Sequence, residues 1–163
     1  MREKCYGCGI CAENCPSGAL KIVGMEITVE ELIKEIEKDV KLYDVSNGGV
    51  TFSGGEPLYQ PEFLLEVLNK CVKADISTAL DTSGYAPKEV FKKMIPYVNI
   101  FLYDIKIINE DNSYKYMGAT SKPILENLRL LIEVDRGRNV ILRFPVIPNI
   151  TDTKENIEEI IKL

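Results

Sequence analysis

Short apolar runs that favour strands alternate along this chain with stretches in which apolar residues recur every three or four positions. The runs predict strands at about 50–52, 76–80, 98–105 and 139–146. The periodic stretches predict helices at about 29–40, 61–73, 87–95, 110–116 and 123–134, and a last helix that Asp152 caps. Because strands that alternate with helices form βαβ units, we expect an α/β fold built on about four parallel strands.

The amino-terminal 24 residues do not share this pattern. They are rich in cysteine and glycine, and they offer too few apolar side chains to form a core of their own. We therefore divide the chain into a small segment over 1–24 and one α/β domain over 25–163, whose first helix begins at a capping box of Thr28 and Glu31. The small segment needs a bound cluster to hold it together.

Composition and charge exclude several classes of function. A formal net charge of −5 argues against a nucleic-acid-binding surface, and the absence of histidine removes the most common general base. The sequence has no apolar stretch of about 18 residues that would span a membrane, and no recognisable signal peptide. Five cysteines, four of them in one run, fit a reducing cytoplasm better than a disulfide framework. The fifth, Cys71, lies in an apolar helical series and is predicted to be buried.

The other four cysteines, Cys5, Cys8, Cys11 and Cys15, form a C-x2-C-x2-C-x3-C-P run with the spacing of a bacterial ferredoxin. Thiolates at these spacings can converge on one cube, so the run is a candidate [4Fe–4S] site. In two-cluster ferredoxins the fourth cysteine of such a run ligates the other cluster, whose own run is not in this sequence. We therefore expect the segment to bind iron poorly. Zinc is a weaker alternative, because these ligands are more closely spaced than usual zinc pairs.

Polar and charged residues follow each predicted strand, at the edge where parallel βα proteins bind ligands. They are Ser53, Gly54, Gly55 and Glu56 after the first strand, Asp81, Thr82, Ser83 and Gly84 after the second, Asp104 and Lys106 after the third, and Arg143 on the fourth. The double glycine lets the backbone approach a ligand closely. Glu56 suits an ammonium group and Lys106 suits a carboxylate, which together describe an amino-acid ligand. The like charges of Asp81 and Asp104 need a cation, a proton or Lys106 between them.

Each of these features also has a structural interpretation. The double glycine is compatible with a simple turn, and Asp81-Thr82-Ser83 with a turn or a helix cap. Asp104 and Lys106 could form a structural pair on one side of a strand, and Arg143 could pair with a carboxylate across the sheet. Because the residues collect at four successive strand ends, we favour a binding site. The aromatic side chains nearby are expected to pack in the core: Tyr97, Phe101 and Tyr103.

Several strings of residues resemble the signatures of one enzyme family. T-F-S-G-G-E-P-L over 51–58 resembles the S-adenosylmethionine-binding signature of radical SAM enzymes. L-D-T-S-G-Y over 80–85, Y-D-I-K over 103–106 and L-R-F-P-V-I-P over 142–148 are similar to strings of glycyl-radical enzyme activating enzymes, of which pyruvate formate-lyase activating enzyme is the best-known member. The stretch over 114–131 looks like that family too. The resemblance covers nearly the whole chain and keeps the family's order.

The resemblance implies a partial (β/α)6 barrel, S-adenosylmethionine and iron–sulfur chemistry. It places Gly54, Gly55 and Glu56 at the methionine amino group and Lys106 at the carboxylate. Ser83 and Arg143 match further positions of the cofactor site and its basic surroundings. A monovalent cation near the carboxylate is the group implied at Asp81, Thr82, Asp104 and the Leu102 carbonyl. That cation would answer the like-charge problem noted above.

The family implies an oxidoreductase activity and a protein partner. A reduced [4Fe–4S] cluster cleaves S-adenosylmethionine, and the 5′-deoxyadenosyl radical takes hydrogen from a glycine of a glycyl-radical enzyme. Flavodoxin or ferredoxin is the implied reductant. The family's C-x3-C-x2-C loop, which holds that cluster, does not occur in these 163 residues. We therefore name no catalytic residue and expect a homologue truncated at both ends and inactive alone. The run at 5–15 resembles part of an auxiliary ferredoxin-like insert.

Two other classes of function stay open at this point. A ferredoxin-type electron carrier fused to an α/β domain predicts a stable low-potential cluster and no affinity for S-adenosylmethionine. A non-catalytic domain that keeps a surface for S-adenosylmethionine or for a partner predicts binding without chemistry. Titration with S-adenosylmethionine separates these two classes.

Overall fold

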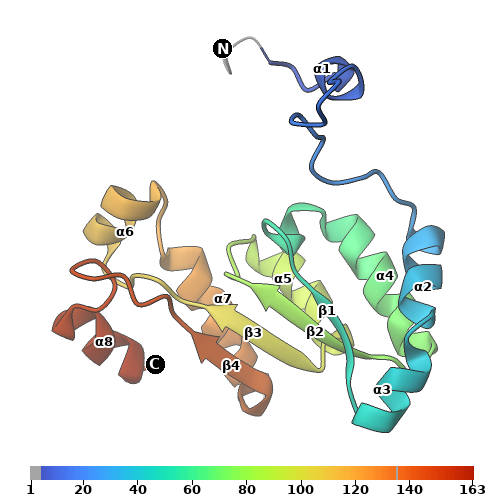
Figure 1. The fold of residues 1–163 in the computed structure, drawn as a ribbon. Helices are drawn as coiled ribbons and strands as arrows, with labels where there is room; N and C mark the ends of the chain where they lie inside the picture. The colour runs from blue at the N-terminus through green and yellow to red at the C-terminus, as the bar shows by residue number, and fades with distance from the viewer. Residues whose placement is uncertain (1–4, 135) are drawn as a thin grey trace.

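Four parallel strands form a single sheet in the order β1-β2-β3-β4 (Figure 1). The computed structural model describes residues 5–134 and 136–163. The strands are β1 (Gly49–Phe52), β2 (Ser77–Thr82), β3 (Ile100–Asp104) and β4 (Val140–Arg143). A spatial order that follows the chain order is that of a (β/α) barrel, whereas a doubly wound sheet reverses its order part-way. The structure thus has the predicted fold class, an open part of a barrel.

Three helices cover one face of this sheet, as Figure 1 shows. They are α4 (Pro61–Lys73), α5 (Lys88–Met94) and α7 (Lys122–Glu133). The other helices are α1 (Ile10–Glu13), α2 (Val29–Glu37), α3 (Val40–Ser46), α6 (Glu110–Met117) and α8 (Lys154–Ile161), with short 3-10 turns η2 (Pro57–Tyr59), η3 (Ile95–Tyr97) and η4 (Gly137–Asn139). None of the helices in the described residues is long and apolar enough to cross a membrane.

The main core lies between the sheet and the covering helices. Phe101 and Tyr103 of β3 are fully buried there against Phe91 of α5. The Phe91 and Tyr103 rings pack edge to face, with their centroids 6.2 Å apart. The Tyr103 hydroxyl donates a hydrogen bond to the Ile124 carbonyl at 2.6 Å, so its polar atom is satisfied inside the core. Tyr97 packs half-buried against the same cluster. The aromatic side chains therefore have the core role predicted from the sequence.

The predicted elements differ from the structure in three places. The helix expected over 29–40 ends at Glu37, and the helix α3 that begins at Val40 was not predicted; side chains of both helices pack on one small core. Asp152 does not cap the last helix: Thr153 accepts the Asn156 N–H there, and Asp152 accepts the Asn149 N–H in the preceding turn. The last strand ends at Arg143, two residues before a proline that has no N–H to donate.

Cys71 belongs to a second, smaller core between α2, α4 and the sheet. Its side chain is 0% exposed, as the sequence predicts, and burial raises the pKa of the thiol to about 11. We expect the folded protein at pH 8 to react quickly with a thiol reagent at four cysteines and slowly at Cys71. Denaturant should expose the fifth thiol. A Cys71→Ser variant should show the same four thiols whether folded or unfolded, and five fast thiols in the folded wild type would contradict this prediction.

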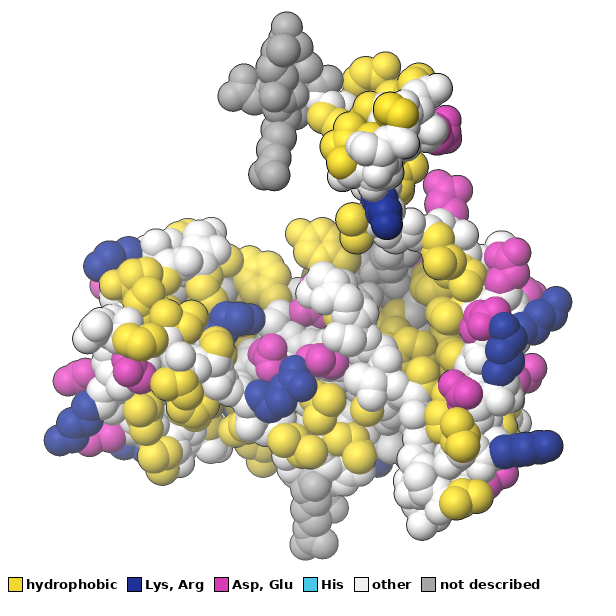
Figure 2. All heavy atoms as spheres, viewed as in Figure 1, with side chains coloured by type: hydrophobic (Ala, Val, Ile, Leu, Met, Phe, Trp, Pro, Cys, Tyr) yellow, Lys and Arg dark blue, Asp and Glu magenta, His cyan; other side chains and the backbone are white. Residues whose placement is uncertain are grey.

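The amino-terminal segment packs differently from the rest of the chain. No described residue before Val29 is buried, and Tyr6, Val23 and Met25 are 85%, 98% and 82% exposed. Figure 1 shows the segment extending away from the sheet, and Figure 2 shows its apolar side chains at the surface. Burial begins near the boundary expected at 24/25. The division into two domains stays a prediction.

Candidate functional site

A cavity of about 250 Å³ lies at the carboxyl ends of the strands. It is lined by Ser53, Gly54, Gly55, Glu56, Asp81, Thr82, Ser83, Asp104, Lys106 and Arg143. The parallel register accounts for this gathering, because it sets Asp104 beside Arg143 and ends β1 to β3 at one edge. Figure 2 shows acidic and basic side chains collected over this part of the molecule. All nine residues outside the cysteine run that were predicted to bind the cofactor or a cation lie here, and Ser53 joins them.

Two carboxylates in the cavity share one guanidinium group. Arg143 donates through Nε to Asp104 at 2.9 Å and through Nη2 to Asp81. The Ser53 hydroxyl donates to the other Asp81 oxygen at 3.1 Å. The Asp104 carboxylate is the main cause of a raised Arg143 pKa, with Asp81 adding to it. The like-charge problem seen in the sequence is thus answered within the chain, by the structural pairing considered for Arg143. A monovalent cation between these carboxylates stays a prediction.

Glu56 receives hydrogen bonds from both neighbouring loops. The Thr82 hydroxyl donates to its Oε1 at 2.5 Å, and the Leu58 N–H donates to the same atom at 3.3 Å. The Ser83 N–H and hydroxyl donate to Oε2 at 3.0 and 2.6 Å. Thr82, which the resemblance assigns to a cation, therefore directs its hydroxyl proton at a carboxylate. The residues predicted to hold an ammonium group and a cation are here bonded to one another.

The remaining charge in the cavity is the ammonium group of Lys106. The side chain is half-buried, and no carboxylate lies within 4 Å of it in the described part of the chain. Its main-chain carbonyl is held by the Asn156 side chain at 2.9 Å, which anchors the backbone while leaving the ammonium group available. Elsewhere in the lining, a Cβ at Gly54 or Gly55 would have no atom of the described residues within 4 Å beyond its own chain neighbours. Among the described residues, the cavity thus combines a cation that no carboxylate pairs with and an open stretch of backbone.

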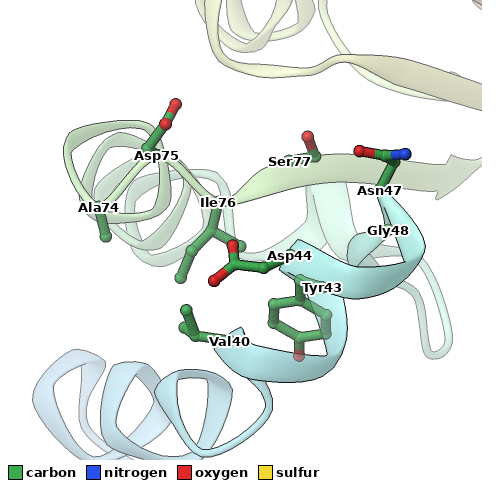
Figure 3. Close-up of a pocket in the computed structure, with 9 residues that line it drawn as sticks. All are labelled: Val40, Tyr43, Asp44, Asn47, Gly48, Ala74, Asp75, Ile76 and Ser77. Carbon is green, nitrogen blue, oxygen red and sulfur yellow. The ribbon is translucent and has the colours of Figure 1, made fainter.

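Larger hollows elsewhere lack this combination. A hollow of about 360 Å³ lies at the opposite end of the sheet, between α3 and the start of β2, and Figure 3 shows the residues that line it. Its lining includes the carboxylates of Asp44 and Asp75 but no lysine or arginine. An apolar groove of about 420 Å³ runs along β1 and shares the Ser53–Glu56 loop with the charged cavity. The predicted chemistry is therefore concentrated at the carboxyl ends of the strands.

The four amino-terminal cysteines do not converge in this structure. Among the described residues, no three cysteine, aspartate or glutamate side chains are placed to hold one metal ion. Cys5, Cys8 and Cys11 are exposed, whereas Cys15 accepts the Leu20 N–H at 3.4 Å. That hydrogen bond is the main cause that lowers the pKa of Cys15 to about 7. As placed, the thiols do not fit a cluster, so no step of the chemistry below passes through them, and a cluster at these cysteines stays a prediction.

The radical SAM superfamily model matches residues 3–163, so the chain belongs to the radical SAM superfamily. It is 40% identical over 159 residues to the choline trimethylamine-lyase activating enzyme of Oleidesulfovibrio alaskensis, covering 98% of this chain and 51% of that protein. It is 42% identical to the trans-4-hydroxy-L-proline dehydratase activating enzyme of Clostridioides difficile, covering 87% and 47%. These relatives are glycyl-radical enzyme activating enzymes, which confirms the predicted resemblance.

Solved structures support the same fold. A domain of pyruvate-formate lyase-activating enzyme from Bacteroides vulgatus has a TM-score of 0.63 and 32% identity, over 71% of this chain and 70% of that one. Streptococcus suis SuiB bound to S-adenosylmethionine has a TM-score of 0.64 at 16% identity, over 87% and 32%, and shows the fold alone. The chain spans about half the length of the curated relatives it matches. What the whole protein does is therefore a separate question.

Proposed function

We propose that these residues form the part of a glycyl-radical enzyme activating enzyme that binds the amino-acid end of S-adenosylmethionine. One observation carries the proposal: among the described residues, the strand-end cavity is lined both by Lys106, whose ammonium group has no carboxylate within 4 Å, and by the open backbone of Gly54 and Gly55. The methionine moiety carries a carboxylate, an ammonium group and a sulfonium, and the cavity offers a cation for the first. Main-chain oxygens of Gly54 and Gly55 offer partial negative charge for the ammonium group, and the two carboxylates that share the Arg143 guanidinium leave a net negative charge in the cavity wall for the sulfonium. The residues present therefore fit this cofactor.

The role of this chain is binding and orientation. In activating enzymes S-adenosylmethionine, with a reduced [4Fe–4S] cluster, supplies the radical that takes hydrogen from a glycine. Here Lys106 would hold the carboxylate, and the Ser53–Glu56 loop would hold the end that carries the amino group. Arg143 keeps Asp81 and Asp104 in place at the wall of the cavity. The C-x3-C-x2-C loop that carries the family's cluster is not in this sequence, so we derive no step of bond cleavage.

The same proposal includes the protein partner, the reductant and the cellular compartment of the whole protein. By its relatives, the whole protein would act on a glycyl-radical enzyme, with flavodoxin or ferredoxin as reductant. Five cysteines without a disulfide among the described residues suit a reducing cytoplasm. Membership of the superfamily argues against a simple electron carrier.

A chain without the cluster loop should form no 5′-deoxyadenosine from S-adenosylmethionine after anaerobic treatment with iron, sulfide and dithionite.

Titration calorimetry with S-adenosylmethionine tests the proposed site. We expect Lys106→Met to weaken binding by about tenfold, because a charge-assisted contact to the carboxylate is lost from a half-buried position. Lys34→Met, which removes an exposed lysine of α2, is the matched control and should leave the affinity unchanged. Absence of binding by the wild type, or equal affinity in the two variants, would contradict the proposal.

A further inference from the structure

The hydrogen-bonding capacity of the Glu56 carboxylate is full. A carboxylate offers about four lone-pair sites, two on each oxygen. Oε1 accepts from the Thr82 hydroxyl and the Leu58 N–H, and Oε2 accepts from the N–H and the hydroxyl of Ser83. All four donors come from the protein itself. A ligand's ammonium group that bonded to Glu56 would have to displace one of these donors and leave a part-buried polar group unpaired.

The bonds to Glu56 also organise the loop that follows β2. Because the hydroxyls of Thr82 and Ser83 direct their protons at Glu56, their oxygens are free to accept. The Thr82 oxygen accepts the Gly84 N–H at 2.9 Å, and the Ser83 oxygen accepts the Tyr85 N–H at 3.3 Å. One carboxylate thus determines the partners of three successive main-chain N–H groups, at positions 83, 84 and 85.

A second side chain holds the far end of the same loop without Glu56. Asn127 of α7 is buried, and its amide donates to the Gly84 and Ala86 carbonyls at 2.8 and 2.9 Å. The Ala86 N–H donates to the Gly84 carbonyl at 2.9 Å. The loop is therefore held on one side by Glu56 and on the other by Asn127. Loss of Glu56 should loosen only the first part of it.

We propose that Glu56 is a positioning residue, which fixes the end of β2 at Thr82 and the loop over 83–85 against the loop over 53–56 and does not itself bind the ligand's amino group. The second half of this statement rests on the proposed function above. The ammonium group is then left to the carbonyls of Gly54 and Gly55, which accept no main-chain hydrogen bond in the described residues. Glu56 acts on the cofactor through Thr82 and Ser83, which line the cavity and which it bonds directly.

Amide hydrogen exchange of the full chain, followed by NMR, tests the positioning role without any ligand. In Glu56→Ala we expect the amides of residues 83, 84 and 85 to exchange about tenfold faster or more. The Ala86 amide, which Asn127 supports, should change by less than about threefold. Glu56→Gln should retain most of the protection, because its remaining oxygen still accepts two bonds and the Thr82 hydroxyl can rotate. Unchanged exchange at 83–85 in Glu56→Ala would overturn the proposal.

A pair of ligands tests whether Glu56 touches the amino group. We compare S-adenosylhomocysteine with its deaminated analogue, and take the ratio of their affinities in wild type and in Glu56→Gln. If Glu56 only positions the loop, the ratio should stay within about threefold of the wild-type value. A ratio that falls to about one, with amide exchange unchanged, would show a direct ligand and overturn the proposal. If the wild type binds neither compound, the proposed function fails, while the exchange experiment still decides the role of Glu56 in the loop.

Discussion

Replacing Gly84 with alanine should destabilise this protein by roughly 2–4 kcal/mol, from backbone strain and overpacking together. Gly84 has a φ of +72°, a conformation that L-amino acids rarely adopt. A Cβ there would also lie 1.8 Å from the Tyr103 hydroxyl oxygen and 2.3 Å from its Cζ. The Tyr103 ring has no room to retreat, because it is fully buried, packs on Phe91 and bonds to the Ile124 carbonyl.

Urea unfolding of Gly84→Ala and Gly118→Ala separates the two causes. Gly118, after α6, has nearly the same φ of +70°, but nothing lies within 4 Å of a Cβ placed there. The control should therefore lose only about 1 kcal/mol, the cost of the backbone conformation. Adding Tyr103→Phe should recover part of the loss in Gly84→Ala, since it removes the atom in closest conflict. Equal losses in the two glycine variants would show that the contact with Tyr103 does not matter.

Replacing Arg143 with methionine should lower the free energy of unfolding by about 1–2 kcal/mol at neutral pH. It should also make the stability of the protein depend on which monovalent cation is in solution. The guanidinium holds Asp81 and Asp104 together, and their side chains are 24% and 31% exposed. Without it, two neighbouring carboxylates repel each other in a partly desolvated cavity. We expect potassium chloride to stabilise Arg143→Met more than choline chloride does at equal ionic strength, because a small cation can enter between the carboxylates.

Thermal unfolding in the two salts measures this effect. Arg129→Met, which removes an exposed arginine of α7, is the matched control and should show no preference between the salts. In the wild type the preference should be small, since Arg143 already occupies the space between the carboxylates. If potassium chloride and choline chloride stabilise Arg143→Met equally, the predicted monovalent-cation site near Asp81 and Asp104 is wrong.

The sequence was sufficient to predict the order of helices and strands and the residues that line the cavity. Pro61 and the apolar spacing after it predict α4 with the bounds that the structure has. Alternation of strands and helices predicts a parallel sheet, and the ends of parallel strands meet at one edge. Residues as far apart as Ser53 and Arg143 could therefore be assigned to one site. The double glycine and the neighbouring charges carry the resemblance to the family that the comparisons confirm.

The sequence did not predict which side chains inside the cavity form ion pairs and hydrogen bonds with one another. The sequence offered a cation, a proton or Lys106 for the two aspartates and allowed Arg143 one unspecified carboxylate across the sheet, but it did not indicate that Arg143, 62 positions from Asp81, holds both. Glu56 looked like a ligand for an ammonium group, yet its bonds go to hydroxyls 26 and 27 positions away. Such choices depend on strand register and on the path of each loop, to within the length of a hydrogen bond. Local residue patterns do not encode distances of that kind.

The sequence by itself determined the class of this protein: a parallel α/β domain with the residues of a radical SAM site at its strand ends. Periodicity sets which residues face the core, and motif spacing sets which chemistry is present, so both are properties of the chain. Only the tertiary structure decided how that chemistry is divided: Arg143 is held by two carboxylates, Glu56 holds a loop, and Lys106 has no carboxylate partner among the described residues. The reason is physical: a charge bonded inside the protein is not available to a ligand, and those bonds exist only once the strands are aligned.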